Sequence, residues 1–150
     1  MSEMKRRSFT LNEAQNLLPV MESLLRTSME SKQRIEEIEE QFKQIKHSVF
    51  LRGGAQLDIA AMSRLRAESD KAIQRVKDAM AEIESIGALV KDLDIGLIDF
   101  PCAVDGATVL LCWKLGEDRI THWHGTSEGF AARKPIDERI ARAGKAKKAN

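Results

Sequence analysis

The stretch LIDFPCAVDGATVLLCWKL, residues 97–115, decides the fold of the last third of this chain. On both sides of its Asp105-Gly106 dipeptide the residues are mostly apolar, β-branched or aromatic, as they are in buried strands. Asp-Gly tolerates the positive φ angles that a two-residue hairpin turn requires. We therefore expect two antiparallel strands joined by this turn, with Asp99 opposite Cys112.

A third strand is predicted over residues 119–124, with a short additional strand over residues 88–93. A three-residue loop at 117–119 would set Cys112 opposite His124. A two-residue loop would instead place the histidines among the apolar side chains, which costs more free energy. With the three-residue loop, the apolar face carries Ile98, Phe100, Leu111, Trp113, Leu115 and Trp123, and the polar face carries Asp99, Cys112, Lys114, His122 and His124.

Residues 10–87 have the pattern of a long antiparallel helical hairpin of the coiled-coil type. Thr10 and Glu13 form a capping-box pattern at its start. Pro19 predicts either a kink or a short helix followed by a long one. A reversal is expected at residues 52–56, and Gly87 is a plausible C-terminal cap. Apolar residues recur at heptad spacing in Ile35, Ile38, Phe42, Ile45 and Val49, and again in Met62, Leu65, Ser69, Ala72 or Ile73, Val76, Met80 and Ile83.

The expected fold class is therefore α+β, with this hairpin, kinked near Pro19, followed by a small three- to four-stranded antiparallel β-meander. Residues 1–150 are expected to form one domain. The hairpin takes about residues 10–87, the meander and its return loop about 88–136, and a basic disordered tail 139–150. Two helices with one seam each bury little apolar area, so a homo-oligomer, most simply a dimer, or another protein partner is expected to cover the remainder.

Charge and composition restrict the setting and the partners. No apolar run approaches the ~20 residues needed to cross a bilayer, so a cytoplasmic protein without membrane contact is expected. Lys and Arg total 24 against 23 Asp and Glu, but the last twelve residues carry five basic and no acidic side chains. Nucleic acid is therefore an expected partner only through this tail. The two cysteines, Cys102 and Cys112, are expected to be reduced thiols.

The polar face contains the residues with the most chemistry. Asp99, Cys112 and His124 form the ligand set of a borderline metal such as zinc, and an Asp–His pair can also act as a general acid and base. The alternative is a hydrogen-bonded structural cluster. Further binding candidates are Glu117, His122 and Arg133, the last on the loop over residues 125–135 that returns across the sheet. The chain contains no HExxH, GxSxG, P-loop or GxGxxG motif.

Many uncommon residues also match one family in order. They are Phe9-Thr10, Glu13-Ala14, Leu17-Leu18-Pro19, Gly96 to Pro101, Asp105-Gly106, Leu111 to Glu117, Trp123-His124, Gly129-Phe130 and Arg133. Over about residues 8–136 the chain thereby resembles the bacterial domain-of-unknown-function family catalogued as 2203. The resemblance implies membership of a family and no particular activity.

Two functions from different classes follow. The first is a non-enzymatic interaction or assembly module, in which the helical hairpin self-associates and the polar face of the sheet docks a partner. The second is a small metal-dependent enzyme or ligand-binding protein that uses the Asp99, Cys112 and His124 cluster. The heptad seams favour the first, and no recognised catalytic motif supports the second.

Overall fold

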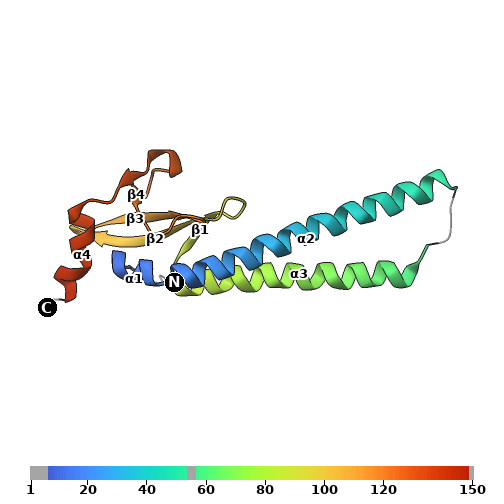
Figure 1. Ribbon diagram of the computed structural model, residues 1–150, viewed down its shortest axis with the longest axis horizontal. Coiled ribbons are helices and arrows are strands. Elements are labelled where there is room, and N and C mark those ends of the chain that lie inside the picture. The colour runs from blue at the N-terminus through green and yellow to red at the C-terminus, as the bar shows by residue number, and fades with distance from the viewer. Residues whose placement is uncertain (1–6, 54–56, 149–150) are drawn as a thin grey trace. The chain divides into compact units, whose positions relative to one another are not determined.

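The computed structural model describes residues 7–53 and 57–148 and has the expected α+β class (Figure 1). A long helix pair precedes an antiparallel sheet, as predicted. The elements in chain order are the helices α1 (Leu11–Asn16), α2 (Leu18–Leu51) and α3 (Ile59–Ile86), the strands β1 (Leu89–Asp92), β2 (Leu97–Val104), β3 (Ala107–Lys114) and β4 (His122–Gly125), the 3-10 helix η1 (Phe130–Ala132), the strand β5 (Lys134–Pro135) and the helix α4 (Glu138–Lys148).

The chain divides into two compact units. The hairpin unit is Arg26–Ala79, and the sheet unit is Met1–Leu25 together with Met80–Asn150. The expectation that the whole chain folds as one domain stays a prediction. Across the described residues, every helix is too short or too polar to cross a membrane.

In the hairpin unit, α2 and α3 run antiparallel and bury the expected seam. Ile38 is 1% exposed and Ala72 also 1%, whereas Ile73 is 37% exposed, so Ala72 holds the seam position that the sequence left open. Across the two helices, Nη2 of Arg34 donates to Oε1 of Glu68 over 2.8 Å. The reversal begins after Leu51, and residues 54–56 of the predicted turn lie outside the described residues.

The N-terminal helix break follows from Pro19. Helix α1 ends at Asn16 and α2 begins at Leu18, so Pro19 lies in the first turn of α2, where its missing amide is not needed. Of the two predicted outcomes, the short helix followed by a long one is confirmed. The capping box is also confirmed, since Glu13 N donates to Thr10 Oγ1 and Thr10 N donates to Glu13 Oε1.

The sheet is fully antiparallel, in the order β1-β2-β3-β4-β5. The predicted pairing of β2 with β3 is confirmed, with Asp99 opposite Cys112. The predicted pairing of β3 with β4 is wrong by two residues: Cys112 lies opposite His122, and His124 lies opposite Leu110. A shift of two positions keeps every side chain on its predicted face.

A longer connection between β3 and β4 explains the shift. The third strand begins at His122, not near residue 119. Glu117 folds back onto the end of β3, where its carboxylate accepts from Lys114 N over 2.8 Å and its carbonyl accepts from Trp113 Nε1 over 2.9 Å. The chain then leaves the sheet to bury Ile120, whose amide donates to Gln15 Oε1 on α1.

The C-terminal segment differs most from expectation. The return loop contains η1 and the two-residue strand β5, which makes five strands instead of three or four. The predicted disordered tail is wrong as far as residue 148, because α4 spans Glu138–Lys148. Asp137 starts this helix by accepting from the amide of Ile140, and the Ile140 side chain is completely buried in the core.

One face of the sheet carries the hydrophobic core. It packs against apolar residues of α1, the first turns of α2, the end of α3, and α4. Phe9 meets Phe100 edge to face, with ring centroids 5.4 Å apart. The core consists chiefly of Phe9, Ala14, Leu18, Met21, Leu25, Ile83, Ile98, Phe100, Cys102, Leu111, Trp113, Ile120 and Ile140. The opposite face is left for the polar candidates.

Pro101 lies where β2 has no strand partner on one side. The described pairing of β1 with β2 stops at Asp99. Beyond it, the carbonyl of Pro101 accepts from Phe9 N over 2.7 Å, and Ser8 Oγ accepts from Ala103 N over 2.9 Å. Pro101 therefore sits at a local edge of the sheet, as its missing amide predicts.

Candidate functional site

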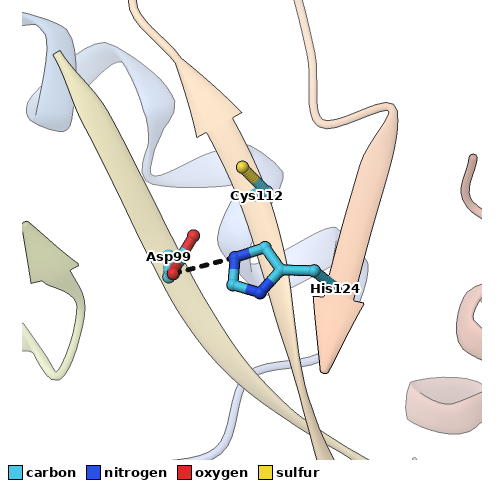
Figure 2. A group of neighbouring side chains, drawn as sticks. All are labelled: Asp99, Cys112 and His124. Atoms are coloured by element: carbon cyan, nitrogen blue, oxygen red, sulfur yellow. Dashed lines mark ion pairs between the residues drawn. The ribbon is translucent and has the colours of Figure 1, made fainter. Parts of the chain in front are cut away.

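Three neighbouring strands bring Asp99, Cys112 and His124 together on the polar face (Figure 2). Their candidate ligand atoms all lie within 4.8 Å of one another. The closest approach is 3.0 Å, between Nε2 of His124 and Oδ2 of Asp99. All three side chains are buried. The predicted grouping of these residues is therefore confirmed, although His124 lies opposite Leu110, two residues along β3 from the expected Cys112.

The His124 ring is oriented by its own strand. Its Nδ1 lies 2.8 Å from the carbonyl oxygen of Gly125. A carbonyl can only accept, so Nδ1 carries the hydrogen in this contact. Histidines that bind metals through Nε2 are commonly held in this way, with the other ring nitrogen donating to a backbone carbonyl. The Nε2 atom is thereby turned toward Asp99 and Cys112.

The Asp99 carboxylate is unusual for a buried group. It has no solvent exposure, and within the described part of the chain neither of its oxygens has a hydrogen-bond partner. The polar side chains beside it are His124, at 3.0 Å in an ion-pair contact, and Cys112. Burial raises the pKa of Asp99, and the nearby His124 opposes this rise. An ionised carboxylate here needs more positive charge than the side-chain contacts supply.

Cys112 is a protonated thiol at neutral pH. Burial is the main cause that raises its pKa to about 12, and the neighbouring Asp99 carboxylate adds to the rise. Cys102 is also buried and free, and burial raises its pKa as well. Cys102 belongs to the hydrophobic core on the other face of the sheet. Only Cys112 is therefore placed to act with Asp99 and His124.

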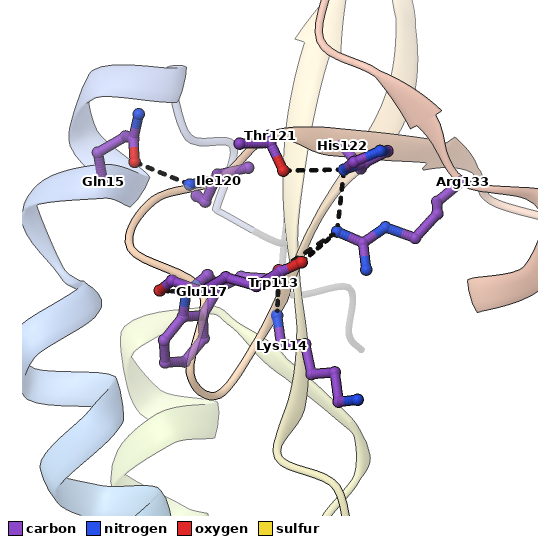
Figure 3. A network of polar contacts seen from close by, with 8 residues as sticks. All are labelled: Gln15, Trp113, Lys114, Glu117, Ile120, Thr121, His122 and Arg133. Atoms are coloured by element: carbon purple, nitrogen blue, oxygen red, sulfur yellow. Dashed lines mark hydrogen bonds and ion pairs between the residues drawn. The ribbon is translucent and has the colours of Figure 1, made fainter.

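The other three candidates form a second cluster on the same side of the sheet (Figure 3). Arg133 Nη2 lies 2.9 Å from Glu117 Oε2 and 3.2 Å from Oε1. The same Nη2 lies 3.1 Å from His122 Nδ1, which is also 2.8 Å from Thr121 Oγ1. An arginine only donates, so Nδ1 of His122 accepts. These contacts tie the return loop to the end of β3 and to β4, in keeping with a positioning role.

Cys112 connects the two clusters, because it lies opposite Asp99 on one side and opposite His122 on the other. All six predicted residues are thus close to one another. Sequence reasoning did not find Gln15 and Thr121, which support the network through Ile120 N and His122. Gln15 is 105 positions away from its partner, so no local pattern could have indicated it.

The donor set fits a zinc ion. Zinc takes Cys sulfur at about 2.3 Å and His nitrogen or carboxylate oxygen at about 2.0–2.2 Å in a tetrahedron, which puts neighbouring donors roughly 3–4 Å apart. Small side-chain rotations would bring donors that lie within 4.8 Å to such spacing. The Gly125 carbonyl already supplies the outer contact to His124.

A family of uncharacterized conserved proteins, DUF2203, matches the chain over residues 7–136. The chain belongs to this family. The DUF2203 match contains the whole sheet and all six candidate residues, and it ends just before α4. No curated protein and no solved structure matches the chain. The function of this DUF2203 protein therefore has to be argued from its site.

Proposed function

We propose that this DUF2203 protein binds one zinc ion through Asp99, Cys112 and His124 and presents it to a small ligand. The observation that carries the proposal is the buried Asp99 carboxylate, which has no well-directed hydrogen bond among the described residues and has only the other two candidate ligands, His124 and Cys112, as close polar side chains. Beside it lies Nε2 of His124, and the Nδ1 of that ring is held by Gly125 O. A divalent cation would supply the charge that the carboxylate lacks.

The alternative, a hydrogen-bonded polar cluster with only a structural role, fits the Asp99 side chain less well. In such a cluster the buried charged groups are hydrogen-bonded to each other, as the Glu117 carboxylate and Nη2 of Arg133 are in the neighbouring network. Donors that hold a metal instead point toward a common centre and not along one another's hydrogen-bond axes. The short but poorly directed contact between Asp99 and His124 has this character.

The ligand types favour zinc over magnesium and calcium. A thiolate and an imidazole suit zinc, whereas magnesium and calcium prefer all-oxygen sites. Three protein ligands leave one position for water or a ligand, as in catalytic zinc sites and unlike closed structural ones. A zinc ion bound there would supply a Lewis acid, while this chain's own residues orient the donors and exclude water.

Metal analysis of untagged protein tests the proposal. After dialysis against zinc and removal of excess ion, one zinc per chain is expected. Cys112→Ser should lower this stoichiometry strongly, whereas the matched variant Cys102→Ser, at the buried cysteine in the core, should keep it. A wild-type protein that retains no zinc, or an equal loss in both variants, would contradict the proposal.

A second function, assembly through the hairpin unit, is supported by apolar side chains near its reversal. Phe50 is 80% exposed, Leu51 68% and Ile59 64%, which is unusual for side chains of this size. We infer that this end of the hairpin associates with a second copy of the chain. Sedimentation velocity at micromolar concentration should show a dimer that Phe50→Ser with Leu51→Ser dissociates, and a strict monomer would refute the inference.

A further inference from the structure

A cavity of about 190 Å³ opens on the sheet unit beside the proposed zinc ligands. It is lined by Arg7, Ser8, Leu89, Lys91, Pro101, Thr108, Leu110 and Thr126. None of these is a ligand of the proposed zinc ion, so the cavity is a feature distinct from the metal site. Its lining contains two cations, two threonines and a serine but no carboxylate.

Strand pairing places the cavity next to the zinc ligands. Leu89 lies opposite Asp99, and Leu110 lies opposite His124. Pro101 follows Asp99 by two residues, and Leu110 precedes Cys112 by two. Side chains two residues apart on a strand share a face and are about 7 Å apart. The cavity and the zinc ligands are therefore neighbours on one face of the sheet.

The two cations of the cavity form no ion-pair contact with a carboxylate within the described ranges. Arg7 contacts the carbonyl of Ile86 at 3.4 Å and the ring of Phe9 at 4.5 Å, neither of which neutralises its charge. Lys91 is exposed and makes no direct ion-pair contact with a described carboxylate, although its charge lies close enough to Asp99 to lower the pKa of that carboxyl. By contrast, Arg133, Lys134, Arg139 and Arg142 of the same unit are each paired with a carboxylate.

Hydroxyl groups complete the lining. Ser8 Oγ accepts from Ala103 N over 2.9 Å, so its own hydrogen remains available to donate. Thr108 and Thr126 add two further hydroxyls at exposed positions. Two cations and three hydroxyl donors around one hollow are the groups that proteins use to hold carboxylate or phosphate oxygens.

We propose that this cavity binds the carboxylate or phosphate group of a small molecule, the ligand that the zinc ion receives. The link to zinc rests on the proposed function, whereas the anion site is inferred from the residues that line the cavity. A cavity of about 190 Å³ suits a short dicarboxylate or a phosphate and is too small for a nucleotide.

Zinc would strengthen anion binding at the cavity. Three protein ligands would leave one position of a tetrahedral zinc ion open. That position would take the second carboxylate of a dicarboxylate whose first carboxylate is held at the cavity by Arg7 and Lys91. The anion affinity of the zinc-loaded protein should therefore exceed that of the metal-free protein.

Titration of the ¹⁵N-labelled full chain tests the proposal. Metal-free protein is titrated with inorganic phosphate and with succinate, and zinc-loaded protein with succinate. We expect saturable amide shifts at Leu89, Thr108 and Thr126, and a lower Kd for succinate when zinc is bound. The phosphate and succinate arms distinguish the two sources of the anionic group.

Two variants locate the binding. Lys91→Met should weaken anion binding by about tenfold, as expected for loss of one charge-assisted contact. Arg119→Met is the matched control, because Arg119 is an exposed cation of the same unit that does not line the cavity. No saturable binding of either anion, or equal weakening by both variants, would overturn the proposal. Anion binding by a chain that takes up no zinc would support the cavity and refute only the zinc function.

Discussion

Nε2 of His124 lies 3.0 Å from Oδ2 of Asp99, although a complete strand separates β4 from β2. The two side chains meet above Cys112 of the intervening strand β3, whose thiol is the third member of the cluster. The site therefore exists only once three strands have paired in register. Its chemistry should report on sheet formation as well as on metal binding.

Asp99→Asn should separate stability from metal binding. Burial raises the pKa of the Asp99 carboxyl, so ionising it in the folded state costs stability, and this cost grows as the pH rises through the folded-state pKa. The asparagine amide carries no charge and can donate to His124 Nε2. At pH 8 the metal-free variant should be more stable by about 1–3 kcal/mol. Thermal unfolding measures the gain, and zinc dialysis should show that metal binding is lost.

Zinc affinity should increase with pH. The pKa of Cys112 is raised to about 12, so the thiol is protonated in the metal-free protein and zinc must displace its proton. One displaced proton predicts about a tenfold gain in affinity per pH unit between pH 6.5 and 8.5, and more if Asp99 also loses a proton. Competition with a chelator at several pH values measures the slope. A flat profile would argue that the thiol is not a ligand.

The hairpin seam can be tested with two isoleucines, one buried and one exposed. Ile38→Asp places a carboxylate at a position that is 1% exposed and should cost about 3–5 kcal/mol. Ile73→Asp changes a position that is 37% exposed and should cost less than about 1 kcal/mol. Urea unfolding of both variants provides the comparison, and equal losses would show that the seam runs differently.

Helix α4 should contribute to stability chiefly through Ile140. Ile140 is completely buried in the core of the sheet unit, so Ile140→Ala should cost about 2–5 kcal/mol. Arg142→Ala on the same helix removes only a surface ion pair with Glu138 and serves as the control. If the two variants melt at the same temperature, α4 is not docked in solution.

Local rules were sufficient for much of this fold. The capping box at Thr10, the helix break at Pro19 and the pairing of Asp99 with Cys112 each depend on a few adjacent residues, and all are confirmed. The length of the connection after β3 was not predictable, because it depends on Gln15 receiving the amide of Ile120 from across the chain. Each side chain of β4 still lies on its predicted face of the sheet, because the register of β3 with β4 differs from the predicted one by two residues.

The site and the C-terminal tail also show the difference between local patterns, which the sequence reveals, and long-range contacts, which it does not. Alternation along three strands was enough to group Asp99, Cys112 and His124, but nothing in the spacing indicated that Gly125 O would orient the imidazole. The alternating Ala, Gly and Lys residues after Ile140 suggested disorder. Asp137 at the start of α4 was a usable capping signal, and the burial of Ile140 could be known only from the packed core.

The margins of the sheet limit how this protein can meet other chains. On one side β1 is four residues long and its register is irregular, and on the other β5 is two residues long and ends in Pro135. The gap beside Pro101 is filled by the backbone of Phe9. The edges of the sheet therefore expose few consecutive unpaired amides and carbonyls, so an extended peptide could form few backbone hydrogen bonds with them. Recognition of another polypeptide should depend on side-chain surfaces, and edge-to-edge polymerisation of the sheet should be suppressed.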